Sequence, residues 1–300
     1  MKSFNKTILL LMLPTTILLA DSVNPVSQLD FSSLVNDFME EGDALKKTIN
    51  LSGRQRMFTQ RMTKLAIQID LNIQKKSSIN KLKKISSLYT KTLMGFKNGD
   101  SDLNLKKATN SKVIEQIDVV EKKWKPFQES IEKVIAGKDD GKALKYLIDN
   151  NEELLKLSNA LVSAYEASNT SSNYLEKARL RVVNVAGRQR MLTQKMTKEK
   201  LLILKGNKEY EPKMKKTIEL FDTTLTALIK GDKSKNITKP TNEKIVEQLK
   251  VVSKIWNELK PLYEKRKNSP KELATIISKN PILLKEMNSM VQMAEKELEY

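Results

Sequence analysis

Apolar residues recur every three to four positions along most of the chain, with lysines and other polar residues between them. This spacing is typical of amphipathic helices that bury one face. Glycine, proline, asparagine and aspartate gather at a few points, where they stop helices. The pattern predicts helices over residues 30–75, 78–98, 110–136, 142–205, 209–230, 242–267, 270–279 and 281–300. The helix over 142–205 could be broken near Ser168–Ser172.

The chain contains two copies of one unit, about 130 residues apart. Residues 50–64 (NLSGRQRMFTQRMTK) and 184–198 (NVAGRQRMLTQKMTK) are identical at 11 of 15 positions. Weaker matches follow downstream, pairing residues 98–100 with 230–232, 115–124 with 247–256 and 154–156 with 283–285. Two copies are fewer than a solenoid needs. We therefore predict an all-α fold of two up-and-down four-helix bundles, related by a pseudo-two-fold axis and joined by a long helix over 151–205. The bundles would occupy residues 21–170 and 171–300.

Residues 1–20 have the pattern of a secretory signal peptide. Two lysines come first, an apolar stretch follows over 8–19, and Ala20 is a small residue before Asp21. Leu18 stands where a small residue is preferred, so an uncleaved N-terminal anchor stays an alternative. We expect an exported, periplasmic chain that starts at Asp21.

The composition narrows the chemistry that such bundles could perform. The chain has 54 Lys and Arg against 36 Asp and Glu, a net charge of +18, and neither His nor Cys. These absences exclude His-dependent nucleophilic catalysis and thiolate metal sites, and no acidic cluster has the spacing that a hard metal ion needs. We therefore expect no enzyme, no metal and no cofactor. Because the lysines of an exported chain are scattered over polar helix faces, we also expect no nucleic-acid partner.

Arginine is distributed differently from lysine. Seven of the eight arginines fall in two short segments: Arg54, Arg56, Arg61, Arg179, Arg181, Arg188 and Arg190. At about 100° per residue, an apolar stripe for the bundle core comprises Leu51, Phe58, Met62, Leu65 and Ile69 in the first copy, and Val185, Leu192, Met196 and Ile203 in the second. Glu199 replaces Leu65 in the second stripe. The opposite face carries Asn50, Gly53, Arg56, Met57 and Gln60, and in the second copy Asn184, Gly187, Arg190, Met191 and Gln194.

Two such faces in one chain can meet each other. A glycine inside a helix costs about 1 kcal/mol relative to alanine, so Gly53 and Gly187 indicate close backbone approach by another helix. Arg56 and Arg190 would then lie near each other, and two buried guanidiniums need a compensating anion. Their planar forks suit a small planar oxyanion. An alternative stays open on the residues alone: both arginines pair with carboxylates or line the rim, and the amides satisfy one another. For Met57, Met62, Met191 and Met196 we expect packing in the core or at the helix interface, and for Trp124 and Trp256 packing in the core of each bundle.

The pattern N-x-x-G-R-Q-R-M-x-[TS]-Q-[RK]-M closely resembles the signature helix of PilJ-type sensor domains, which belong to type IV pilus chemotaxis transducers. It is also similar to the periplasmic P-box helix of NarX/NarQ-type nitrate and nitrite sensor kinases. The resemblance implies a periplasmic four-helix bundle whose signature helices pair at a dimer axis. It implies that the Arg directly before the motif Met, Arg56 or Arg190, contacts a nitrate-like anion, with Gly53 and Gly187 on the same face. Arg54 and Arg188 would lie near the rim.

These observations lead to two hypotheses about function. In the first, the protein is an exported sensor that binds nitrate or nitrite and reports to a membrane-bound sensor kinase or chemoreceptor. It would do so as a monomer with an internal pseudo-dimer or as a homodimer, through Arg56, Arg190, Gly53, Gly187, Asn50, Asn184, Gln60 and Gln194. No transmembrane helix or signalling module follows the second copy, so we expect signalling to need that partner. In the second, it is a ligand-independent helical adaptor that docks on a chemotaxis transducer or pilus component, its arginines satisfied by carboxylates.

Overall fold

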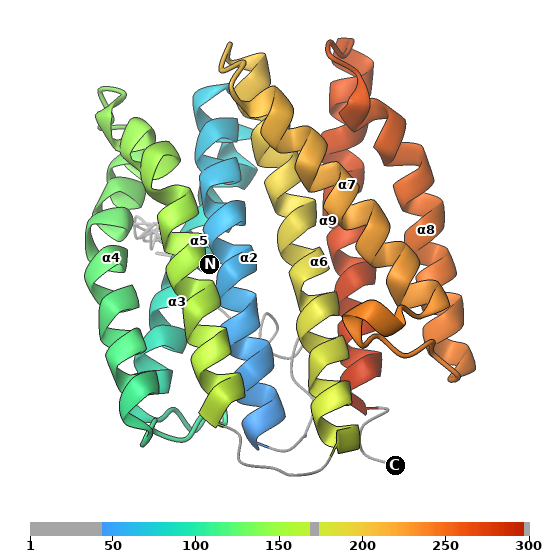
Figure 1. The fold of residues 1–300 in the computed structure, drawn as a ribbon. Helices are drawn as coiled ribbons and strands as arrows, with labels where there is room; N and C mark the ends of the chain where they lie inside the picture. The colour runs from blue at the N-terminus through green and yellow to red at the C-terminus, as the bar shows by residue number, and fades with distance from the viewer. Residues whose placement is uncertain (1–43, 169–173, 297–300) are drawn as a thin grey trace, which may run out of the picture. The chain divides into compact units, whose positions relative to one another are not determined.

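The computed structural model describes residues 44–168 and 174–296, so the predicted signal peptide lies outside the described residues (Figure 1). Within these ranges the regular elements are helices, together with two isolated β-bridges, Asp100 with Leu105 and Asp232 with Ile237. The all-α prediction is confirmed. The elements are α2 (Ala44–Asp70), α3 (Lys75–Asn98), α4 (Ser111–Ile135), α5 (Lys142–Ser168), α6 (Tyr174–Leu204), α7 (Tyr210–Lys230), the 3-10 helix η1 (Lys233–Lys235), α8 (Glu243–Glu264) and α9 (Pro270–Lys296).

Local sequence signals explain several helix ends. α3 and α7 are each followed by a glycine in the left-handed region, Gly99 with φ 85° and Gly231 with φ 79°, a conformation that glycine adopts without steric cost. The side chains of Asn110 and Asn242 accept hydrogen bonds from backbone N–H groups in the first turns of α4 and α8. Such caps satisfy donors that a helix start leaves unpaired. All four residues lie at or beside the predicted breaks.

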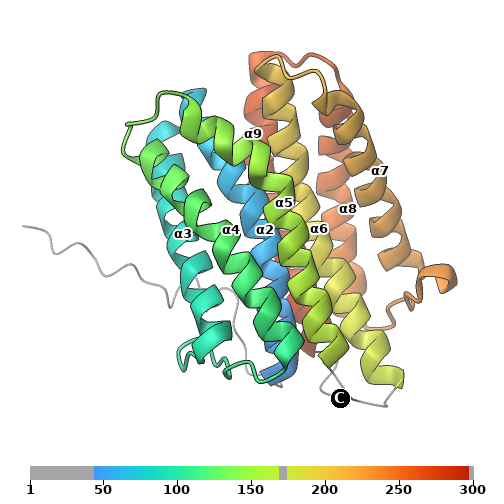
Figure 2. The same ribbon diagram turned by 60° about the vertical axis from the view of Figure 1, so that its left-hand side comes forward.

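The helices form two groups, α2 to α5 and α6 to α9, with α2 lying along α6 between them (Figures 1 and 2). α2 and α6 run in the same direction. Asn50 contacts Arg190, and Asp70, at the end of α2, pairs with Lys205 beyond the end of α6. The two motif helices therefore meet within one chain, which is one of the two arrangements that the sequence leaves open. A pseudo-two-fold relation between the two groups stays a prediction.

The predicted continuous helix over 151–205 is wrong, and the alternative of a break near Ser168–Ser172 agrees with the end of α5 at Ser168. α5 and α6 run in opposite directions, because Glu166 near the end of α5 contacts Asn184, whereas Glu152, earlier in α5, contacts Lys198, later in α6. Figure 1 shows the end of α5 and the start of α6 on the same side of the bundle. Each group therefore has its own four helices, and α6 begins the second group rather than extending the first.

Two other predicted boundaries need correction. The break expected between residues 279 and 281 does not occur, since α9 continues through Pro281. Proline removes one backbone hydrogen bond from a helix, and α4 and α8 tolerate Pro126 and Pro261 in the same way. The first break comes earlier than predicted: Asn72 and Gln74 have φ of 56° and 46°, which ends α2 at residue 70 and starts α3 at residue 75.

A tryptophan lies in the core of each group. Trp124 packs on Tyr89 and Trp256 on Phe221, with ring centroids 4.2 Å and 4.5 Å apart, and both tryptophans are buried. The indole N–H groups donate to Thr90 and to Asp222, respectively. The motif methionines are also buried: Met57, Met62, Met191 and Met196. The predicted packing roles of the tryptophans and methionines are confirmed.

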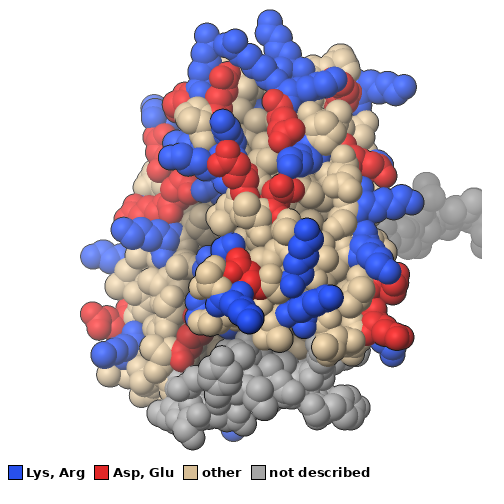
Figure 3. Space-filling view, turned by 45° about the vertical axis from the view of Figure 1, so that its right-hand side comes forward, with Lys and Arg blue, Asp and Glu red and all other residues tan. Residues whose placement is uncertain are grey.

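The surface is mixed in charge. Figure 3 shows basic side chains spread over one face with acidic side chains between them, rather than gathered in a single basic patch. The helices in the described part of the chain include none with the length and apolar character needed to cross a membrane.

Candidate functional site

The motif is buried on every side of α2. From Ile49 to Ile69, every side chain except that of Arg61 is buried. α2 packs against α3 and α5 of its own group and against α6 of the other group. Burial all round is typical of a helix at the centre of a larger assembly. The polar face of the motif therefore lies inside the protein, in the seam between α2 and α6.

Arg56 is held in this seam by neutral acceptors. Its side chain is 1% exposed. Nη1 donates to Oδ1 of Asn159 on α5 at 3.1 Å, and Nε donates to the backbone oxygen of Gly53 at 3.4 Å. Among the described residues, no carboxylate oxygen lies within 4.0 Å of its guanidinium. A buried cation without an ion-pair partner is unusual, because desolvation is costly.

Arg190 occupies the corresponding place in α6. Its Nη1 donates to Oδ1 of Asn288 on α9 at 2.9 Å, and its Nη2 donates across the seam to Oδ1 of Asn50 at 2.7 Å. Asn159 and Asn288 thus play the same part in the two copies. Asn50, predicted as a ligand-binding residue, orients Arg190.

The two motif glycines make room for these guanidiniums. A Cβ atom at Gly53 would lie 3.1 Å from Nη2 of Arg56. A Cβ atom at Gly187 would lie 3.2 Å from Nη2 of Arg190 and 3.6 Å from Nη2 of Arg56. Both Nη2 atoms therefore border the same small space beside Gly187. The expectation that the glycines admit the backbone of another helix is wrong, because the nearest described atoms belong to arginine side chains.

The electrostatics of the seam are unfavourable to Arg56. Burial first, and then the positive charges of Arg188 and Arg190, lower its pKa from 12.5 to about 9. The carboxylate of Glu166 has a weaker, opposite effect. Like charges so close together are tolerated only where some other interaction compensates them.

The remaining predicted site residues are not gathered around the guanidiniums. Asn184 donates to Glu166 at 2.6 Å. Gln194 accepts from Lys64 at 2.6 Å and donates to Thr193 and Asn280, so protein groups occupy both ends of its amide. Gln60 donates to the adjacent threonine, Thr59. The structure thus brings together Arg56, Arg190, Gly53, Gly187 and Asn50, and it leaves Asn184, Gln60 and Gln194 in other contacts.

The expected rim position of the other motif arginines is wrong for Arg54. Arg54 is 1% exposed, so it lies in the interior. Arg188, at the matching position of the second copy, is half-buried. The two copies therefore differ in how far this arginine reaches the solvent.

Both copies of the repeat match one protein family. Residues 39–149 and 176–277 match a family described as the type IV pili methyl-accepting chemotaxis transducer N-terminal region, PilJ. The chain belongs to the PilJ family. The first PilJ segment covers α2 to the start of α5, and the second covers α6 to the start of α9. The predicted resemblance, in two tandem copies, is confirmed, and the PilJ family points to a sensing or signalling role related to chemotaxis transducers. No curated protein matches the chain.

Sequence reasoning missed two buried lysines at the end of the PilJ motif. Lys64 of the first copy donates to Gln194 and to Asn280 of the second, at 2.6 Å and 2.8 Å. Lys198 of the second copy donates to Asn151 of the first at 2.7 Å and pairs with Glu152 at 2.6 Å. Each copy therefore inserts a lysine into the polar core of the other. The sequence did contain a signal for these lysines, because Lys64 and Lys198 occupy the same position in the two repeated segments and are identical.

An acidic residue stands in the apolar stripe of α6. Glu199 is fully buried, and its carboxylate lies 3.8 Å from Nζ of Lys195. Burial raises its pKa above the usual 4.5, although Lys198 and Lys195 act in the opposite direction. In the first copy the same position holds the buried Leu65. Within the described residues, no group of three or more acidic side chains could hold a metal ion.

Proposed function

We propose that the protein is an exported PilJ-type sensor that binds a small planar oxyanion, of the nitrate or nitrite kind, between α2 and α6. It reports its ligand state to a membrane-bound sensor kinase or chemoreceptor. The anion lies between Arg56 and Arg190, beside Gly187. The charge of the ligand compensates two guanidiniums that the protein itself leaves close together.

The observation that carries the proposal is the environment of Arg56. Its guanidinium is buried, it bonds neutral oxygens of Asn159 and Gly53, and two further arginines lie nearby. An anion accepting from Nη2 would offset both the desolvation and the repulsion. Guanidinium groups bind planar oxyanions through paired N–H donors, which a lysine cannot offer.

Calorimetric titration of the purified protein with nitrate, nitrite and chloride tests this proposal. We expect nitrate or nitrite to bind, with one anion per chain if the protein is a monomer by mass measurement. Arg56→Gln and Arg190→Gln should each abolish the binding. Arg266→Gln is the matched control, since Arg266 is exposed and pairs with Glu211 at 3.6 Å. Absence of heat and of thermal stabilisation with every oxyanion, in a folded protein, would exclude the proposal.

The second candidate is a ligand-independent adaptor that docks on a chemotaxis transducer or pilus component. It is favoured by the amide contacts, because Asn159, Asn288 and Asn50 hold the guanidiniums with protein groups alone. Within the described part of the chain, the carboxylate pairing that this hypothesis expects is not found at Arg56. One measurement distinguishes the two functions, namely the association of the protein with its membrane partner. For an adaptor, nitrate and Arg56→Gln leave this association unchanged. For a sensor, both alter it.

A further inference from the structure

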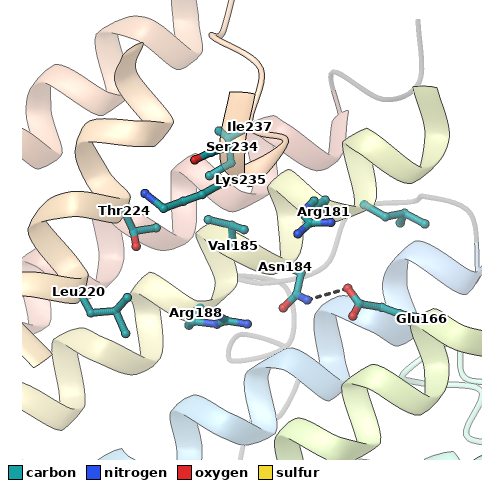
Figure 4. A pocket seen from close by; sticks show the side chains of 11 residues that line it. Glu166, Arg181, Asn184, Val185, Arg188, Leu220, Thr224, Ser234, Lys235 and Ile237 are labelled. Atoms are coloured by element: carbon teal, nitrogen blue, oxygen red, sulfur yellow. Dashed lines mark hydrogen bonds between the residues drawn. The ribbon is translucent and has the colours of Figure 1, made fainter. Parts of the chain in front are cut away.

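A pocket of about 610 Å³ lies beside α6 in the second copy (Figure 4). Its walls come from α5, α6, α7 and the segment around η1. Among the described residues that line it, Arg181, Arg188 and Lys235 are basic and Glu166 is the one carboxylate. An apolar wall completes it, made of Leu180, Val185, Leu220 and Ile237. The volume is in the range of pockets that hold small organic molecules.

The first copy provides an internal comparison for this pocket. Asp100 and Asp232 each form a β-bridge with the residue five positions later. Oδ1 of Asp100 accepts from the backbone N–H of Leu103 at 2.9 Å, and Oδ1 of Asp232 accepts from that of Lys235 at 3.2 Å. The two loops therefore have the same construction, and Lys235 stands at the place of Leu103.

The side chains at these matched places behave differently. Leu103 is fully buried in the first copy, whereas Lys235 is exposed. Leu88 and Leu220 each precede the loop glycine by eleven residues, and they are 0% and 43% exposed, respectively. Leaving a leucine in water forgoes the stabilisation that its burial would bring. At these two places the first copy has buried leucines, whereas the second has an exposed lysine and an exposed leucine beside the pocket.

The charges of the pocket are incompletely compensated. Among the described residues, neither Arg181 nor Arg188 has a carboxylate within 4.0 Å. Lys235 pairs with Asp232 at 2.7 Å, and Glu166 accepts from Asn184 at 2.6 Å. Residues 181, 184 and 188 share one face of α6, because they are three and four positions apart. That face presents two guanidiniums to the pocket, with the amide of Asn184 between them (Figure 4).

We propose that this pocket is a second binding site, which takes a small organic carboxylate with an apolar body. The guanidiniums of Arg181 and Arg188 receive the carboxylate, since a planar fork matches its two oxygens, and the ammonium of Lys235 adds positive charge to the pocket. The apolar body covers Leu220, Val185 and Ile237. The site uses Arg181 and Lys235, which lie outside the PilJ motif, and it does not depend on an anion in the α2–α6 seam.

The test is a titration of the full-length protein with benzoate, followed by backbone amide chemical shifts. Benzamide has the same ring without the charge, and acetate has the charge without the ring. We expect benzoate to shift amides of α6 and of residues 232–237 saturably, and benzamide and acetate to bind roughly tenfold more weakly or worse. Arg181→Gln and Lys235→Leu should weaken benzoate binding to a similar degree. Lys235→Leu introduces the residue type that the first copy has at the matched position, Leu103. Lys233→Gln is the matched control, an exposed lysine of the same loop outside the pocket lining.

Three results would overturn the proposal: no saturable shift with benzoate, equal binding of benzamide, or unchanged binding in Lys235→Leu. Both substituted side chains are exposed, so a circular dichroism melt should show the parent fold. Arg56→Gln separates this site from the seam. It should abolish nitrate binding while benzoate still binds, and failure of nitrate binding in the parent protein would leave the benzoate result intact.

Discussion

Replacing Arg56 by methionine should make the ligand-free protein more stable. Burial and the neighbouring Arg188 and Arg190 lower the pKa of Arg56 from 12.5 to about 9. At 1.36 kcal/mol for each pKa unit, keeping this charge in the seam costs about 5 kcal/mol. The hydrogen bonds to Asn159 and Gly53 return part of that, about 1.5–3 kcal/mol for a charged donor. Methionine fills similar space without a charge, so we expect the free energy of unfolding to rise by about 2 kcal/mol.

Urea denaturation in low-salt buffer, followed by the fluorescence of the buried Trp124 and Trp256, measures this change. Arg266→Met is the control. It removes an exposed ion pair with Glu211 and should alter the free energy of unfolding by less than about 0.5 kcal/mol. Nitrate should stabilise the parent protein by about 2.7 kcal/mol at a hundred times its Kd and should leave Arg56→Met unaffected. A loss of more than about 1 kcal/mol in Arg56→Met without anion would refute the reasoning, because it would mean that the guanidinium is well compensated by the protein alone.

Three further predictions concern other buried groups. Burial first, and then nearby cations, hold the pKa of Lys64 well below 10.5. The unfolded chain therefore binds more protons than the folded one, and the free energy of unfolding should rise with pH towards 10.5. Urea titrations between pH 7 and 10 should show this rise in the parent protein and not in Lys64→Met. Burial raises the pKa of Glu199 above 4.5, so the folded protein binds more protons and the free energy of unfolding should fall as pH rises past 4.5. Glu199→Leu should remove that fall, and a pH profile equal to that of the parent would contradict the prediction. Trp256→Phe should cost about 1–3 kcal/mol, since it leaves the carboxylate of Asp222 without its indole donor; a thermal melt equal to that of the parent would show that this bond is dispensable.

Much of the fold follows from local signals in the sequence. Helix ends near Gly99, Gly231, Asn110 and Asn242 depend on backbone conformation and capping, which nearby residues decide. The separation of α5 from α6 was only weakly signalled, because the helical pattern over 142–205 contains no proline and no glycine before Gly187, and the polar run near Ser168–Ser172 indicates a break without deciding it. Tertiary contacts between the two helices, such as Glu152 with Lys198, reveal their opposite directions.

The candidate site was predictable in part. Arg56 and Gly53 are three positions apart, so their contact on one helix face follows from helical geometry. That geometry also explains the error about the glycines, because the guanidinium of the same helix reaches the space first. Asn50 was predicted, but Asn159 and Asn288, which accept from Arg56 and Arg190, lie far away in the sequence and were missed. A signal existed, since the spacing that aligns residues 154–156 with 283–285 also aligns Asn159 with Asn288.

The place of Glu199 has a consequence for how such a protein can vary. In a dimer of identical chains, each substitution at a central position appears twice, and a carboxylate introduced into the core would be buried on both sides. Here the two motif helices belong to one gene product, so one half keeps Leu65 while the other carries Glu199. Mutation can therefore change one half while the other preserves the packing. In a single chain with two PilJ segments, the surface and the interior of the two halves can diverge. Two identical chains in a symmetric dimer cannot diverge from each other in this way.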